Sequence, residues 1–93
     1  MVIRQKIKIS DERINCLSDK YHSQNQRLKS TMLFSITKVM ENNCLPSSFD
    51  LSYPLNGVYD LIKEVLSDLG IAPIQIRAIF RKKHYLYHVQ LAL

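Results

Sequence analysis

The sequence has few of the residues that the common cofactor and metal motifs require. It has no tryptophan and only two glycines, Gly57 and Gly70, so it contains no glycine-rich phosphate-binding loop. Its three histidines and two cysteines do not occur at the spacing of a zinc site. We therefore expect neither a bound metal nor a cofactor.

Long apolar runs are also missing. The most apolar stretch of the first half, TMLFSITKVM (31–40), is ten residues long and is too short to span a bilayer. The first ten residues alternate charged and apolar side chains, which is not typical of a signal peptide. We expect a cytoplasmic protein without membrane contact, in which Cys16 and Cys44 are reduced and buried.

Acidic residues are absent from residues 73–93, which carry four Lys or Arg. Residues 41–72 carry five acids and one lysine, and residues 1–40 carry eight cations and three acids. The ends are therefore basic and the middle acidic, within a net charge of +5. This asymmetry favours an anionic partner at the ends, although the cations can also be no more than solvated strand faces.

Length and composition predict one globular domain, 1–93. The chain is 46% hydrophobic and 23% charged, which is not the composition of a disordered segment. A domain of this size buries only a small core, so a homodimer would add stability, and we expect one.

Periodicity predicts a strand followed by helices in the first half. VIRQKIKI (2–9) alternates as a half-buried strand does. The outward face of this strand carries Arg4, Lys6 and Lys8. Ser10 is suited to cap a helix, and helical spacing then continues to about residue 42. Asn25 tolerates the left-handed conformation and favours a division into two helices, with one long bent helix as the alternative.

The middle of the chain predicts a loop and one further helix. Residues 42–57 form the loop, in which FDLSY (49–53) could be a short strand. Apolar residues at helical spacing predict a helix from Val58 to Leu69, capped by Asn56 and ended by Gly70. Its exposed face carries an acidic row formed by Asp60, Glu64 and Asp68.

The last twenty residues predict an antiparallel hairpin folded about Lys82 and Lys83. The apolar residues share one face when the strands pair as Phe80–Tyr85, Ala78–Tyr87, Ile76–Val89 and Ile74–Leu91. Phe80, Tyr85 and Tyr87 would then lie in the core. A two-residue turn needs positive φ at both positions, for which Lys-Lys is unsuitable, so we expect a longer or bulged turn over residues 81–84.

The polar side of this hairpin is the predicted binding site. It carries Arg77, Arg81, Lys82, Lys83, His84 and His88. If the N-terminal strand joined the hairpin, Arg4, Lys6 and Lys8 would extend the same face. Cations on an open sheet bind phosphate by charge and by counterion release, so the sequence predicts DNA or RNA as the partner.

Two other functions stay open. The chain could be a protein-binding adaptor or inhibitor that acts through a sheet edge, the acidic row or the apolar C-terminus VQLAL (89–93). It could also be a small metal-independent RNase toxin, with His84 or His88 as acid or base beside the cations. We favour a non-enzymatic protein.

Residues 2–43 resemble ribbon-helix-helix DNA-binding proteins in the order of their elements, a basic-faced strand followed by two helices. The resemblance implies that the strand pairs with its twin in a dimer and that Arg4, Lys6 and Lys8 read the major groove. It also implies a phosphate contact from Ser30 or Thr31. The chain lacks the glycine that is often found between the two helices. The sequence as a whole predicts an α+β fold in which the C-terminal hairpin packs on the helices.

Overall fold

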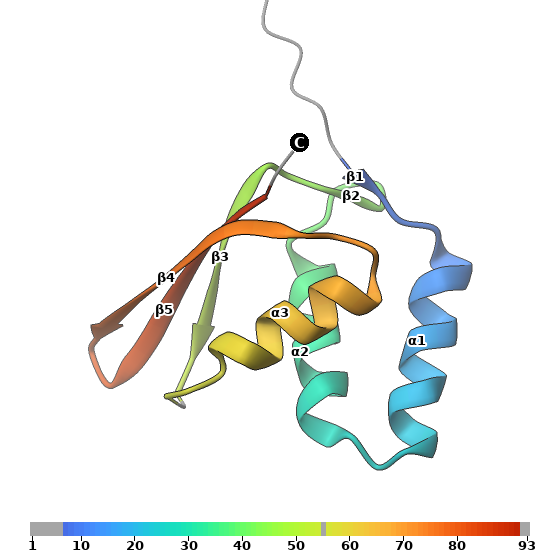
Figure 1. Cartoon of the computed structure of the whole chain (residues 1–93), viewed down its shortest axis with the longest axis horizontal. Coiled ribbons are helices and arrows are strands. Elements are labelled where there is room, and N and C mark those ends of the chain that lie inside the picture. The colour runs from blue at the N-terminus through green and yellow to red at the C-terminus, as the bar shows by residue number, and fades with distance from the viewer. Residues whose placement is uncertain (1–6, 55, 92–93) are drawn as a thin grey trace, which may run out of the picture.

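The computed structural model describes residues 7–54 and 56–91 and has the predicted α+β fold (Figure 1). The elements follow in the order β1 (Ile7–Lys8), α1 (Asp11–Ser23), α2 (Arg27–Lys38), β2 (Cys44–Leu45), β3 (Ser48–Tyr53), α3 (Tyr59–Asp68), β4 (Pro73–Arg81) and β5 (His84–Leu91). Over the part of the chain that is described, no helix is long and apolar enough to cross a membrane.

A three-stranded antiparallel sheet forms one layer of the fold, with the strand order β3-β5-β4. Along β3 the side chains alternate between exposed and buried, and Phe49, Leu51 and Tyr53 are the buried ones. They belong to one core cluster with residues of α2 and α3, such as Ile36 and Val65. The helices therefore cover one face of the sheet, which we call the inner face. The opposite face, the outer face, is left to solvent.

Two helices, α1 and α2, occupy the predicted helical region of the first half rather than one, and they part at Asn25 as predicted. Helix α2 ends at Lys38, before the expected residue 42. Asn25 has a φ of 54°, in the left-handed region that asparagine tolerates. Ser10 caps α1, since its hydroxyl oxygen accepts a hydrogen bond of 3.2 Å from the Arg13 backbone N–H.

The N-terminal strand does not join the hairpin at its described residues. Ile7 and Lys8 pair instead with Leu45 and Cys44, in a separate two-stranded sheet. The side-chain amide of Asn43 fixes this arrangement, because it donates to the Ile9 carbonyl at 3.1 Å and to an Asp11 carboxylate oxygen at 2.6 Å. The described part of this strand is therefore bonded within the chain, whereas the ribbon-helix-helix arrangement uses that strand to pair with a second copy.

The third strand of the main sheet comes from the expected loop. The segment FDLSY does form a strand, and β3 pairs with β5 over six residues, from Ser48–Gln90 to Tyr53–Tyr85. Because β4 occupies the other side of β5, the central strand has no free edge for the N-terminal strand.

The hairpin register is as predicted for Phe80–Tyr85, but the turn is not. Lys82 and Lys83 have φ values of 49° and 66° and form a tight two-residue turn, so the longer turn expected over residues 81–84 is wrong. Burial of the inner face fixes the register, and the lysines then adopt left-handed conformations at a cost of roughly 1–2 kcal/mol each.

The predicted pairing at the far end of the hairpin is also wrong. Leu91 lies opposite Pro73 rather than Ile74, with a register shift between Pro73 and Gln75. Proline cannot donate to the ladder and is tolerated at the first residue of a strand, where it disturbs regular pairing.

Helix α3 ends as predicted but begins later. Gly70 has a φ of 82°, and the Ile71 N–H donates to the Leu66 carbonyl at 2.8 Å, as in a Schellman motif. Asn56 is not the cap. Val58 occupies the N-cap position, and its side chain makes no capping hydrogen bond. Asn56 is separated from the helix by Gly57, which has a left-handed conformation.

The cysteines are both free, but their burial differs from the prediction. Cys44 is half-buried and Cys16 is exposed. Cys16 precedes the buried Leu17 on α1 and therefore points about 100° away from the apolar side of the helix.

The acidic row of α3 is partly used inside the fold. A Glu64 carboxylate oxygen lies 3.5 Å from the Lys29 ammonium of α2. The hydroxyl of Tyr21, a side chain that is 1% exposed on α1, donates to an Asp68 carboxylate oxygen at 2.5 Å. These contacts join α3 to the other two helices.

The Tyr21–Asp68 hydrogen bond gives a prediction about stability and pH. Burial, reinforced by Asp68, raises the pKa of Tyr21 well above its usual value of about 10. The folded state keeps this proton longer than the unfolded state does. The stability that neutral Tyr21 contributes is therefore complete below about pH 10 and is lost as the pH rises further.

We expect Tyr21→Phe to lower the free energy of unfolding by about 1–2 kcal/mol at neutral pH, because it removes a hydrogen bond to a charged group. It should also reduce the loss of stability above about pH 10. Urea unfolding across the pH range measures both effects. Tyr59→Phe, at an exposed tyrosine, is the control and should retain the wild-type pH dependence. Equal alkaline losses in Tyr21→Phe and wild type would contradict the assignment.

Candidate nucleic-acid interface

The outer face of the main sheet is built from rows of residues that run across the strands. One row places Asp50 of β3, His88 of β5 and Arg77 of β4 side by side. Toward the turn, the next outer row contains Leu86 and Ile79, and His84 pairs with Arg81 beyond it. Alternation along each strand gives these rows a common face.

The structure brings six of the predicted site residues together. Four lie on the outer face and two form the turn at its end: Arg77, Arg81, His84 and His88, with Lys82 and Lys83. Lys8 is exposed but belongs to the other sheet. Arg4 and Lys6 lie outside the described residues.

Asp50 is a member of this face that the sequence interpretation missed. One of its carboxylate oxygens lies 2.6 Å from His88 Nδ1, so it forms a hydrogen bond with the imidazole and an ion pair when His88 is protonated. The alternation in FDLSY places Asp50 opposite Phe49 and Leu51, on the polar side of a strand. What the sequence did not reveal was that this strand pairs with β5.

The two hairpin histidines do not converge. His84 has its Nδ1 at 3.3 Å from the Lys82 carbonyl oxygen, beside the turn. His88 lies four residues further along the same strand, which corresponds to about 13 Å. In the described ranges, no group of three or more His, Cys, Asp or Glu residues is placed to hold a metal ion.

A hollow of about 350 Å³ opens on the outer face beside the turn. It is lined by Ser52, Leu86, His84, Arg81 and Lys82. The walls combine cations and hydroxyl or imidazole groups with one aliphatic side chain. Such a surface can accept a phosphate oxygen together with the edge of an apolar or aromatic group.

The end of the hairpin is exposed on both faces. Phe80 is 62% exposed on the inner side and Ile79 is 53% exposed on the outer side. The expected burial is therefore wrong for Phe80, whereas Tyr87 is buried and Tyr85 is half-buried. The physical reason is visible in Figure 1, where the β4–β5 turn points away from the helices, which cover only the other end of these strands.

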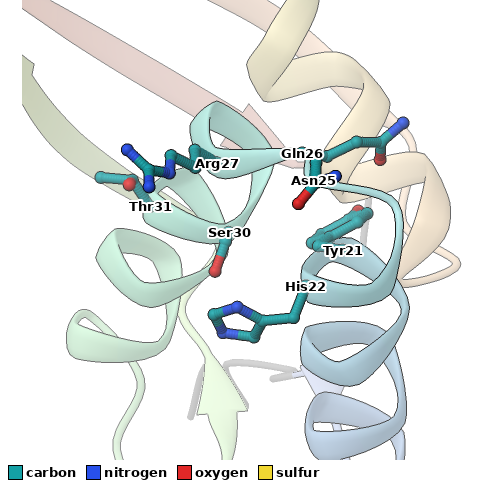
Figure 2. Close-up of a pocket in the computed structure, with 7 residues that line it drawn as sticks. All are labelled: Tyr21, His22, Asn25, Gln26, Arg27, Ser30 and Thr31. Atoms are coloured by element: carbon teal, nitrogen blue, oxygen red, sulfur yellow. The ribbon is translucent and has the colours of Figure 1, made fainter.

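A second hollow lies between α1 and α2, near their connection. Figure 2 shows that His22 and Ser30 point into it, whereas Gln26 and Arg27 point away from it. Thr31 also lines this hollow, so the two residues expected to touch phosphate are both found here. Arg27 is the one Lys or Arg among its lining residues, so the hollow offers less positive charge to an anion than the outer face does.

Comparison with protein-family models, with curated proteins and with solved structures gave no match to this chain. The charge, exposure and geometry of the outer face are therefore what indicates a function for this chain.

The Lys82-Lys83 turn yields a prediction about stability. We expect the double substitution Lys82→Asn and Lys83→Gly to raise the free energy of unfolding by about 1–2 kcal/mol. Asn-Gly adopts positive φ at little cost at both positions, and the greater freedom of glycine in the unfolded chain offsets part of that gain. Chemical unfolding measures the gain, and the slope of the free energy of unfolding against denaturant concentration should stay unchanged.

The matched control is Lys82→Ala with Lys83→Ala. It removes the same two charges but leaves two residues with a Cβ atom, for which the left-handed region is unfavourable. The alanine variant should gain far less stability than the Asn-Gly variant. Equal gains would attribute the effect to charge repulsion rather than to backbone strain.

Proposed function

We propose that the protein binds DNA or RNA through the outer face of its main sheet, without catalysing a reaction. The observation that carries this proposal is the gathering of four cations on one open surface, where Asp50 is the single carboxylate among the described residues. The cations are Arg77, Arg81, Lys82 and Lys83.

Exposure and chemistry support a phosphate ligand. All four cations are exposed, so their long side chains are free to reach a partner. Asp50 opposes an anion on this face, but the four cations outnumber it, so the face keeps a positive net charge. Lys and Arg bind phosphates by replacing condensed counterions, so binding should be sensitive to salt and largely independent of sequence. Homodimerisation and a cytoplasmic location remain predictions.

The adaptor alternative now depends mainly on the edges of the main sheet. Glu64 and Asp68 already contact other helices, and Val89 and Leu91 are buried in the core. The outer edges of β3 and β4 in the described sheet remain for a protein partner. The RNase alternative can use either His88, in the row with Arg77, or His84, beside Arg81 and Lys82. The two histidines cannot act together on one phosphate, because about 13 Å of strand separates them.

The proposal predicts that replacing Arg77, Arg81, Lys82 and Lys83 together by Ser will weaken binding to a random duplex and to structured RNA at low salt. The plot of log affinity against log salt should become shallower by about 3, since each lost phosphate contact removes about 0.7–0.9. Fluorescence anisotropy over a salt titration measures both quantities.

A control of equal charge comes from the helical side of the molecule. It replaces four exposed cations of the helices by Ser: Lys20, Arg27, Lys38 and Lys63. This variant should keep the wild-type salt slope apart from a small general effect of net charge. If the two variants bind equally well, the outer face is not the site, and if wild type binds neither nucleic acid at low salt, the proposal fails.

The carboxylate on this face gives a prediction of opposite sign. Asp50→Asn keeps an oxygen that can accept from His88 but removes the negative charge. We expect affinity for nucleic acid to rise by about two- to tenfold, because one repulsive charge close to phosphate is removed. Asp60→Asn on α3 is the control and should have little effect. A fall in affinity for Asp50→Asn would mean that Asp50 supports the site rather than opposing it.

A further inference from the structure

The end of the hairpin carries an exposed aromatic ring, Phe80, which a phosphate-binding face does not require. The inference drawn from it rests on the nucleic-acid binding proposed above. We propose that the hairpin end binds single-stranded nucleic acid, with one base stacked on the Phe80 ring and the adjoining phosphates bound by Arg77, Arg81 and the turn lysines.

Phe80 is an exposed ring supported by its own chain. Its centroid lies 4.8 Å from that of Tyr85, at an interplanar angle of 48°. Tyr85 in turn lies 6.5 Å from Tyr87, which is buried in the core. This series of three aromatic rings links the exposed ring to the rigid part of the sheet. Phe80 can therefore present an aromatic surface to a ligand without first being ordered by it.

The cations lie within reach of the same ligand. Phe80 and Arg81 are neighbours in sequence, and residues 77–81 are exposed without interruption. Because β4 is an edge strand, both of its faces can be reached from one side. A nucleic-acid strand that follows this edge can place phosphates beside the outer cations and turn a base toward the inner side, against Phe80.

The requirement for an unpaired base points to a single strand. In a duplex the faces of the bases are already stacked on one another and are closed to a side chain. Single strands offer these faces, and proteins that bind them combine a cationic path with aromatic stacking positions. The outer cations alone would bind duplex and single strand through phosphate in a similar way.

Phe34 provides a comparison within the chain. It is 60% exposed, almost as much as Phe80, but it lies on α2, away from the sheet. The ammonium group of Lys38 lies 4.5 Å from its ring centroid, so its own chain already provides a cation–π partner. Phe34 is therefore the matched control, because its exposure is close to that of Phe80 but it lies on a helix and not beside the outer face.

The experiment uses the full chain with fluorescein-labelled oligothymidylate and with a random duplex of equal length, at low salt. We expect Phe80→Ala to weaken binding to the single strand by about tenfold and to leave duplex binding within about twofold. Phe34→Ala should change neither. Phe80 packs at the exposed end of the hairpin, and circular dichroism checks that each variant is folded.

A direct test of stacking uses the absence of tryptophan from the sequence. Phe80→Trp introduces a single tryptophan at the proposed stacking position, and Phe34→Trp places one on α2. Tryptophan fluorescence can be excited apart from that of the five tyrosines. Unlabelled oligothymidylate should quench the fluorescence of Phe80→Trp and leave that of Phe34→Trp unchanged, because only a base in contact with the indole ring quenches it.

The outcomes separate this inference from the proposed function. If Phe80→Ala binds the single strand as wild type does, or if Phe80→Trp is not quenched on binding, the stacking site is wrong. Loss of binding in the four-cation variant would then still support the phosphate-binding face. If an acidic peptide with alternating apolar residues quenches Phe80→Trp and the oligonucleotide does not, the edge is a docking site for protein and the inference is overturned.

Discussion

The arrangement of the molecule depends on β5, which pairs along both of its edges. Its pairing with β3 on one side and β4 on the other fixes which side chains face the helices. Tyr87, Val89 and Leu91 are buried on the inner face, so the intervening residues must point outward. The same ladder places Asp50, His88 and Arg77 in one row. A shift of one residue in either pairing would turn the polar residues toward the core, and the candidate interface would not form.

The helices set the second constraint, because they are shorter than the hairpin. They cover the inner face near β5 residues 87–91 and leave the turn end uncovered. Inner-face residues near the turn, which longer helices would bury, are therefore exposed, and Phe80 is the clearest example. Exposed aromatic and aliphatic side chains on an edge strand would favour aggregation, and a dense group of cations at the same end opposes it. The cations therefore have a role in solubility whether or not nucleic acid binds.

Much of the fold followed from local patterns in the sequence. The break at Asn25, the stop at Gly70 and the register of Phe80 with Tyr85 depend on residues close together in the chain, and all three are confirmed. Two failures are local, at the Lys82-Lys83 turn and at the Asn56 cap. Two others, which bear on the candidate site, involve distant parts of the chain. The exposure of Phe80 depends on how far the helices reach, and the place of Asp50 depends on a strand partner almost forty residues away. No periodicity encodes either property.

The distribution of charge between the two layers links the core to the candidate interface. On the helical side, Glu64 lies close to Lys29, and Asp68 accepts the buried hydroxyl of Tyr21. Two carboxylates of an acidic helix thus serve to join the helices, and they do so away from the sheet's outer face. On that face, the carboxylate of Asp50 is beside His88, and the turn beyond it carries cations alone. The positive potential should therefore increase along the sheet toward the hairpin turn, which is where Phe80 is exposed. A phosphate chain attracted by this potential would be drawn to the end of the sheet where an aromatic ring is available to a base.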